Sequence, residues 1–350
     1  RRLMDDKIDG IKEKVCVLYR QHFGKGPEYV ELLPASGSAR KYYRLGDGRE
    51  FCIGAYHKDV DENRLFIRFS CHFREKGLHV PQVYSVSHDG LVYLQEDLGN
   101  TMLLDVIEQE RQAEGWEKRL PELYRKSLAE LLRFQFLGGE GLDYSLCVPR
   151  PVFDRRCISW DLNYFKYCFL RLAGVPFSED ALENDFERLT ARLLEVERTA
   201  FMFRDFQSRN IMVRENNVWF IDYQGGRQGA LHYDVASLLY DAIAEVPEVY
   251  KESLLDDYIM MLQQYRRVDA DLFRKEYYCF VLIRLLQAMG AFGLRGLYER
   301  KQHFIDSIRP GLSNISSLFK PGKLGNDYPE IQKVADELIC TFSKTSLREG

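Results

Sequence analysis

The sequence predicts an α+β protein with two lobes, a small N-terminal lobe with an antiparallel β-sheet and helices, and a larger, mainly helical C-terminal lobe. Short apolar segments between turn residues characterise residues 1–95, whereas longer segments with helical spacing characterise residues 100–350. A short connector at 96–99 is expected to be the hinge. With 350 residues, 45% of them hydrophobic, the chain is long enough to bury a large core. Clefts between such lobes are common ligand sites.

The N-terminal lobe is expected to begin with an amphipathic helix over residues 4–24, where apolar side chains recur at helical spacing. Short strands follow between 29 and 56, and a GDG turn predicts that the last two form a hairpin. A helix over 61–77 and two strands around 88–90 complete this lobe. In the C-terminal lobe, residues 210–222 carry the one β signal. Helical spacing there predicts helices over 120–137, 160–173, 180–198, 232–245, 250–266 and 273–298.

The charge, the cysteines and the apolar runs of the sequence disfavour several classes of protein. The net charge of −4 gives no electrostatic reason to expect nucleic acid as a partner. Eight cysteines are scattered without a CxxC pair, which disfavours a structural zinc site and favours a reducing compartment. No run of 18 uncharged apolar residues and no signal-peptide pattern is present, so we expect a cytoplasmic protein without a membrane partner.

The segment NIMVRENNVWFID has the pattern of a β-hairpin that turns at Asn216 and Asn217. With the turn centred on 216, Asn210 and Asp222 are equidistant from it and meet at the open end of the hairpin. A register slip of one residue would turn one of them to the opposite face. Asp205, five residues before Asn210, is close enough to loop back over that end.

Two carboxylates and an amide oxygen in one place suit Mg²⁺, which prefers hard oxygen ligands and commonly takes the rest from phosphates. This is the arrangement of a phosphoryl-transfer site, in which one Asp accepts the proton of the substrate hydroxyl while an Asn and a second Asp hold the metal. A D-x4-N pair alone arises often by chance among turn residues. The hairpin, and Asp222 at its matching end before YQGG, favour the functional interpretation.

The stretch FRDFQSRNIMV…VWFIDYQGGRQGALHYDVASLLYDA resembles the catalytic core of the aminoglycoside phosphotransferase and choline kinase-like superfamily, which has a protein-kinase-like fold. It looks closest to the branch of bacterial sugar kinases that phosphorylate N-acetylmuramate and N-acetylglucosamine at the anomeric hydroxyl. Across residues 25–310, SGSARKYYRL is similar to that branch's phosphate-facing hairpin, HVPQVY to a strand, YLQEDLG to the hinge, and RLLQAMGAFGLRGLYERK to a late helix.

The resemblance implies ATP and Mg²⁺ as cofactors, with Asp205 as the catalytic base and Asn210 and Asp222 as metal ligands. It also implies two contacts to the nucleotide. Backbone N–H groups would face the phosphates at Gly37, Ser38 and Ala39, and the hinge backbone would hold adenine at Gln95, Glu96 and Leu98. Asp234 matches a family Asp that buttresses the catalytic loop, although its position before an apolar helix equally fits an N-cap.

Two departures from the family pattern stand out. Phe203 replaces the usual His of the catalytic loop, and we expect it to brace the loop by apolar packing. The strand EFCIGAY lacks the Lys that pairs with the α- and β-phosphates in protein kinases. Lys58, Arg40 or Arg209 are candidates for that charge, although Lys58 is as readily explained as a solvated loop residue.

Other charged residues near the motif have competing interpretations. Arg209 is assigned to phosphate or substrate, and Arg204 to an internal ion pair with Asp234 or Asp222. Arg227 is expected to be a solvated loop residue. The helix expected over 155–173 carries Trp160, Asp161 and Tyr164 on neighbouring turns. These side chains could form an aromatic and acidic surface that binds a sugar, but half-buried contacts with the core are favoured.

The leading functional hypothesis is an ATP- and Mg²⁺-dependent small-molecule kinase that phosphorylates a hydroxyl of a sugar or amino sugar. A charge-balanced C-terminal segment disfavours polycationic antibiotics as substrates. The alternative is a nucleotide-binding pseudokinase or the regulatory module of a longer protein, motivated by Phe203 and the missing strand Lys. A protein kinase is disfavoured because no APE-like segment follows Asp222.

Overall fold

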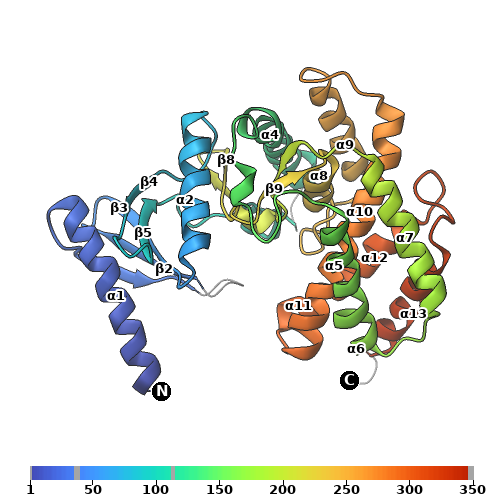
Figure 1. The fold of residues 1–350 in the computed structure, drawn as a ribbon, viewed down its shortest axis with the longest axis horizontal. Coiled ribbons are helices and arrows are strands. Elements are labelled where there is room, and N and C mark those ends of the chain that lie inside the picture. Colours follow the sequence, from blue (N-terminus) through green and yellow to red (C-terminus); the bar gives the residue numbers. More distant parts are fainter. Residues whose placement is uncertain (1, 35–39, 112–114, 346–350) are drawn as a thin grey trace.

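The computed structural model describes residues 2–34, 40–111 and 115–345. A sheet with two long helices occupies one end of the molecule, and a larger helical region occupies the other (Figure 1). The sheet is antiparallel throughout, with strand order β1-β2-β3-β5-β4. Its strands are β1 (Tyr29–Leu32), β2 (Lys41–Gly46), β3 (Phe51–Tyr56), β4 (Val83–Val86) and β5 (Val92–Glu96).

The two faces of the sheet are covered by different helices. Helix α1 (Arg2–Phe23) packs Val15 and Leu18 against Leu94 on one face. Gly54 of β3 permits this close approach, because a side chain there would collide with Val15. Helix α2 (Val60–Glu75) covers the opposite face and stacks Phe66 on Tyr93 at 5.2 Å. Alternation along β5 therefore divides its side chains between the two helices.

The large region is organised around α10 (Ala270–Phe292), a helix that is mostly buried from Tyr277 onward. The other helices are α3 (Leu103–Glu110), α4 (Arg119–Arg133), α5 (Arg155–Phe165), α6 (Arg171–Ala173), α7 (Glu179–Glu195), α8 (His232–Leu239), α9 (Glu248–Leu262), α11 (Gln302–Asp306), α12 (Ile308–Leu318) and α13 (Pro329–Thr345). Helices α4, α5 and α10 continue into π-helical turns at Phe134–Gly138, Lys166–Leu170 and Gly293–Tyr298. Single 3-10 turns lie at Gly115–Glu117, Tyr144–Leu146 and Ser208–Asn210.

Helix α10 with its π-helical extension is also long and apolar enough to cross a membrane by length and composition, the one such helix in the described part of the chain. However, 78% of its most apolar window is buried inside the protein, as in a core helix.

Two small antiparallel sheets lie between α7 and α8 in the sequence. Strands β6 (Ala200–Met202) and β9 (Arg227–Gly229) form one pair, and β7 (Ile211–Arg214) and β8 (Asn217–Phe220) form the expected hairpin. The β6–β9 pair was not predicted, because three-residue strands carry too few side chains to show a period.

The α+β architecture, the N-terminal sheet and the predominance of helices after residue 100 are confirmed. The expected helix over 232–245 ends earlier, at Leu239. The helix expected over 155–173 begins at Arg155, as predicted, and becomes π-helical after Phe165. Helices α11, α12 and α13 were not predicted from the sequence.

Candidate active site

The loop 203–210 connects β6 to the hairpin and carries Asp205 and Asn210. Its last three residues form the 3-10 turn Ser208–Asn210. The side-chain Nδ2 of Asn210 donates to the backbone carbonyl of Asp205 at 2.9 Å and so folds the loop back on itself. The Asp205 side chain stays 47% exposed, which leaves its carboxylate accessible to a ligand. The structure therefore brings the two residues together, as the sequence predicted.

Asp222 follows β8 and lies beside the same loop. The hairpin register differs from the expected one: Arg214 faces Asn217, so the turn is Glu215–Asn216 and not centred on Asn216. Asn210 consequently faces Ile221, whose N–H donates to the Asn210 carbonyl at 3.1 Å.

The backbone of Asp222 is left-handed, with φ of 62°, so it leaves the strand at this residue instead of continuing the ladder. Burial and the nearby Asp205 carboxylate raise the pKa of Asp222 above its usual value. The Asp205 and Asp222 carboxylates are thus neighbours, although the hairpin register differs from the predicted one. Gln224 Nε2 donates to Asp222 Oδ1 at 2.7 Å, which leaves the second oxygen for another partner.

These residues fit a magnesium ion. In Asn210 the amide nitrogen is committed to the loop, so the amide oxygen is the atom that can bind metal. Asp222 supplies a half-buried carboxylate whose charge a cation would stabilise. Within residues 2–34, 40–111 and 115–345 no group of three or more His, Cys, Asp or Glu side chains could hold a metal. Mg²⁺ needs only one or two carboxylates when phosphates complete its shell.

Asp234 braces the start of the loop 203–210. Its carboxylate accepts hydrogen bonds from the backbone N–H groups of Phe203, at 2.6 Å, and Arg204, at 3.1 Å. Burial raises the pKa of Asp234 to about 7. Because α8 begins at His232, Asp234 lies inside the helix, and the N-cap interpretation is wrong.

Asp241 braces the other end of the loop and was missed from the sequence. Its carboxylate accepts from the backbone N–H of Ser208 at 3.1 Å and from the Ser208 hydroxyl at 2.6 Å. The available signal was an Asp directly after the apolar run of α8.

Phe203 is buried at the centre of an aromatic cluster. Its ring centroid lies 4.9 Å from that of Phe134 and 5.0 Å from that of Phe206. The ring is only 2% exposed. This agrees with the expected apolar brace, because the side chain packs beneath the loop while its backbone N–H binds Asp234.

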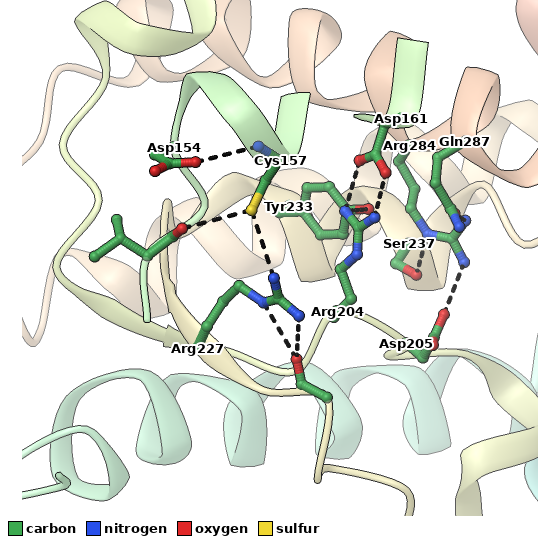
Figure 2. Close-up of polar contacts among 12 residues, drawn as sticks. Asp154, Cys157, Asp161, Arg204, Asp205, Arg227, Tyr233, Ser237, Arg284 and Gln287 are labelled. Atoms are coloured by element: carbon green, nitrogen blue, oxygen red, sulfur yellow. Dashed lines mark hydrogen bonds and ion pairs between the residues drawn. The ribbon is translucent and has the colours of Figure 1, made fainter. Parts of the chain in front are cut away.

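Arg204 is structural, but its partner is neither Asp234 nor Asp222. The guanidinium forms a two-pronged ion pair with Asp161 of α5 and donates to the Tyr233 hydroxyl at 2.7 Å (Figure 2). Asp161 is buried and committed to this pair, so it offers no free carboxylate for a sugar platform. Of the platform residues, Trp160 remains 45% exposed.

The expectation that Arg227 is a solvated loop residue is wrong. It lies in β9, is 7% exposed, and donates to the backbone carbonyl of Gly225 at 3.1 Å and to the Cys157 sulfur at 3.5 Å (Figure 2). The β6–β9 pairing holds it inside the protein, and that pairing had no signal in the sequence.

Arg40 extends from the start of β2 toward the same centre. Its guanidinium is buried and donates to Glu62 of α2 at 2.9 Å. The positive charges of Arg209 and Arg40 both act to lower the pKa of Asp222, against the larger effect of burial. Arg40 and Arg209 therefore lie on the side of the site that contains the proposed metal ligand. Arg209 itself is half-buried.

The remaining predicted nucleotide contacts are spread along the N-terminal sheet. Gly37, Ser38 and Ala39 lie outside the described residues. Lys58 is exposed in the turn between β3 and α2, and no ion pair joins it to another residue of the described chain. The structure therefore does not bring Lys58 to the carboxylates.

Gln95 and Glu96 are the last residues of β5, and Leu98 lies buried just beyond them. Glu96 forms an ion pair with Arg214 of β7 at 3.1 Å, and its backbone N–H donates to the Gln82 carbonyl at 2.8 Å. This segment thus connects the five-stranded sheet to the hairpin that bears the acidic residues.

Comparison with solved structures shows a shared fold. The chain is similar to a choline/ethanolamine kinase family protein from Mesorhizobium loti, with a TM-score of 0.59 and 14% identity over 93% of this chain and 99% of that one. It is also similar to the amicoumacin kinase hAmiN, solved with AMP-PNP and Ca²⁺, with a TM-score of 0.58 and 14% identity over 95% of this chain and 93% of that one. The expected kinase-like fold is confirmed.

Curated relatives are similar in sequence over part of the chain. An N-acetylmuramate/N-acetylglucosamine kinase of Pseudomonas aeruginosa is 28% identical over 236 residues, and the match spans 65% of each chain, just under two thirds. The protein of that name from Pseudomonas putida is 26% identical over 261 residues, or 72% of each chain.

A model of the phosphotransferase enzyme family matches residues 30–270, which include the loop, the hairpin and most of the N-terminal sheet. The loop, the hairpin and the kinase-like architecture thus agree with the match, and the chain belongs to the phosphotransferase enzyme family.

Proposed function

We propose that the protein is an ATP- and Mg²⁺-dependent kinase that transfers the γ-phosphate to a hydroxyl of a sugar or amino sugar. The observation that carries this proposal is the grouping at the loop: Asn210 binds the Asp205 backbone, and the Asp222 carboxylate lies near that of Asp205, which is still half-exposed. The membership of the phosphotransferase family and the names of the curated relatives support it.

Asp205 acts as the general base. It accepts the proton of the acceptor hydroxyl while that oxygen forms a bond to the γ-phosphorus and the bond from this phosphorus to the bridging oxygen of ADP breaks. Asn210 Oδ1 and one Asp222 oxygen would hold magnesium, which when bound supplies positive charge to the phosphate oxygens. Arg209 stabilises phosphate charge from the same loop.

Arg40 takes the place of the strand Lys that this chain lacks. In protein kinases a strand Lys pairs with a Glu of the helix that packs on the sheet. Here the buried Arg40 pairs with Glu62 of α2 at 2.9 Å, and its charge acts on Asp222. We assign Arg40, and not the exposed Lys58, to the phosphates.

ATP is proposed to bind between residues 1–95 and 100–350, which act as nucleotide-binding and catalytic lobes around a hinge at 96–99. Backbone N–H groups at 37–39 are assigned to the phosphates. Because the Glu96 N–H already binds the Gln82 carbonyl, the backbone contact to adenine is assigned to Leu98, with Gln95 beside it.

The acceptor class is an N-acetylated amino sugar, with the anomeric hydroxyl as the phosphorylated group. The relatives' names include both N-acetylmuramate, which carries a carboxylate, and N-acetylglucosamine, which is neutral. The Asp205 side chain is 47% exposed, so its carboxylate is accessible to an acceptor hydroxyl.

An ADP-release assay over N-acetylated amino sugars, other hexoses and amino alcohols tests the proposal. We expect Mg²⁺-dependent release with the first group, and a fall of about 10²- to 10⁴-fold in Asp205→Asn, because a general base is lost. Asp336→Asn, an exposed carboxylate on α13, is the matched control and should keep full activity. Tight nucleotide binding without transfer to any acceptor would instead favour a pseudokinase.

A further inference from the structure

Arg284 of α10 approaches the proposed base, a contact that the sequence did not predict. Its guanidinium is buried, and Nη2 lies 3.7 Å from Asp205 Oδ1 (Figure 2). Burying a cation is unfavourable unless a counter-charge lies near. In the described part of the chain, Asp205 is the one carboxylate within ion-pair distance of Arg284, although the charge of Arg284 also acts to lower the pKa of the buried Asp234. The position of this arginine is therefore coupled to the base.

Two other side chains fix the direction of the guanidinium. Arg284 Nε donates to the Ser237 hydroxyl of α8 at 2.9 Å, and Nη1 donates to Gln287 Oε1, one turn along α10, at 2.6 Å. Nη2 is consequently aimed at Asp205 by groups that do not belong to the catalytic loop. Helix α8 also carries Asp234, which holds the loop backbone at 203 and 204, so one helix orients both partners.

The contact differs from the other Arg–Asp pair of this region. Arg204 binds both oxygens of Asp161, a carboxylate that is only 6% exposed and makes a structural cross-link. Arg284 reaches one oxygen of Asp205 at 3.7 Å, beyond hydrogen-bond length, while that side chain remains 47% exposed. Arg204 therefore occupies both oxygens of the Asp161 carboxylate. Arg284 restrains the Asp205 carboxylate but leaves its oxygens available.

We propose that Arg284 is a positioning residue for the reaction: its charge holds the Asp205 carboxylate in the orientation that faces the acceptor hydroxyl, without occupying the oxygen that takes the proton. This inference rests on the proposed kinase function. It adds a residue that lies beyond the 30–270 segment matched by the family model. Orientation of a reacting group accounts for large rate factors in enzymes, so the loss of this contact should affect turnover.

The test compares Arg284→Met and Arg284→Lys with wild type in steady-state kinetics. For Arg284→Met we expect kcat to fall about 10- to 100-fold, with KM for the sugar nearly unchanged, because the base is misaligned while the acceptor contacts remain. Arg284→Lys keeps the charge and should recover part of kcat. A merely structural role would not produce this separation of kcat from KM, nor recovery by Lys.

Arg227→Met is the matched control, because Arg227 is equally buried and contacts Gly225 and Cys157 but not Asp205. The kcat of Arg227→Met, calculated per folded molecule, should stay near the wild-type value. Thermal unfolding of each variant gives the folded fraction. If Arg284→Met does not fold, Ser237→Ala removes the hydrogen bond to Nε while keeping the guanidinium, and should lower kcat in the same direction by a smaller factor.

Two sugars and water as acceptors separate the possible outcomes. An equal fall in kcat with N-acetylmuramate and N-acetylglucosamine supports the proposal. An unchanged kcat, or a loss confined to KM for the acidic sugar, would overturn it and make Arg284 a carboxylate receptor or a structural residue. If wild type phosphorylates no sugar, the proposed function fails. The variants are then compared in ATP hydrolysis, in which water replaces the sugar hydroxyl and gives its proton to Asp205. An unaltered hydrolysis rate in Arg284→Met would then still refute the role of Arg284.

Discussion

At the scale of single residues, the loop 203–210 and Asp222 beside it each contain an uncommon backbone conformation. Arg204 has φ of 81° and Asp222 has φ of 62°, and neither is glycine. Such conformations cost free energy and persist where surrounding contacts enforce them. Asp234 binds two loop N–H groups and Phe203 packs beneath them, so these two residues stabilise the conformation that presents Asp205.

Replacement of the loop's aromatic brace should be costly. We predict that Phe203→Ala lowers the free energy of unfolding by about 3–5 kcal/mol, because a fully packed ring is lost. Urea denaturation would measure it. Phe23→Ala serves as the control, since that ring is 42% exposed and its loss should cost much less. Equal midpoints for the two variants would show that Phe203 does not brace the loop.

Asp234 should give stability a specific pH dependence. Burial raises its folded-state pKa to about 7, above the unfolded value of about 4, so the folded protein binds more protons here between those values. The stability contributed by this carboxyl is therefore fully present below pH 4 and is lost as pH rises through 7.

Asp234→Asn removes that titration. The difference in unfolding free energy between wild type and the variant should accordingly shrink from pH 5 to pH 8, measured by urea denaturation at each pH. Asn would present its NH₂ donor to one of the two backbone N–H donors that Asp234 binds, so the variant should also be less stable by about 1–3 kcal/mol at pH 5. A difference independent of pH would rule out a raised pKa.

At the scale of secondary-structure elements, most long periodic segments were predictable, with α12 and α13 as exceptions, whereas the three-residue strands β6 and β9 were not. The N-terminal strands, α1, α2 and most of α10 carry enough side chains to show their period. The hairpin was placed correctly but its turn was assigned one-half residue too late. Glu215 and Asn216 both take positive φ, 51° and 61°, which a two-residue hairpin turn requires, and nothing about Glu215 indicates this beforehand.

Helix α10 depends on a glycine at its π-helical end. A side chain at Gly293 would collide with the backbone carbonyl of Cys168 in the neighbouring π-helical turn. We predict that Gly293→Ala lowers the melting temperature. Gly10→Ala, within α1 and with nothing within 4 Å, should instead stabilise the protein by about 0.5–1 kcal/mol, because alanine favours helix. Changes of the same sign in both variants would contradict this packing.

At the scale of the whole molecule, α2 links the N-terminal sheet to the acidic residues. The Ser70 hydroxyl donates to the Phe66 carbonyl at 2.7 Å, so the Tyr223 hydroxyl is the donor in its 2.6 Å contact with Ser70. Tyr223 follows Asp222 directly and stacks on Phe66 with ring centroids 5.0 Å apart. The proposed metal ligand is therefore attached to the helix that carries Glu62 and pairs with Arg40.

Contacts between residues far apart in the sequence explain what the sequence could not predict. Asp205, Asn210 and Asp222 lie within one short segment, so their grouping follows from local pattern. The partners of Arg204 and Arg284 are 43 and 79 residues away, and only the packing of α5 and α10 against the loop brings them together. Sequence reasoning consequently assigned Arg204 the wrong partner and missed Arg284.

Nucleotide binding should stabilise the whole molecule in a metal-dependent way. With ATP and Mg²⁺ at about 100 times the dissociation constant, we expect about 2.7 kcal/mol of added stability, measured as a rise in melting temperature. Asp222→Asn should lose the Mg²⁺-dependent part of that rise, whereas Asp336→Asn should keep it. A rise that is the same with and without Mg²⁺ would argue against a metal at Asn210 and Asp222.

The most direct test of the central claim is the ³¹P NMR spectrum of wild-type protein incubated with ATP, Mg²⁺ and N-acetylmuramate or N-acetylglucosamine. The proposed function predicts a new sugar-phosphate resonance, coupled to the anomeric proton, that grows with ADP and is absent with Asp205→Asn. ATP that stays intact, or a sugar phosphate that forms equally well with Asp205→Asn, would contradict the account.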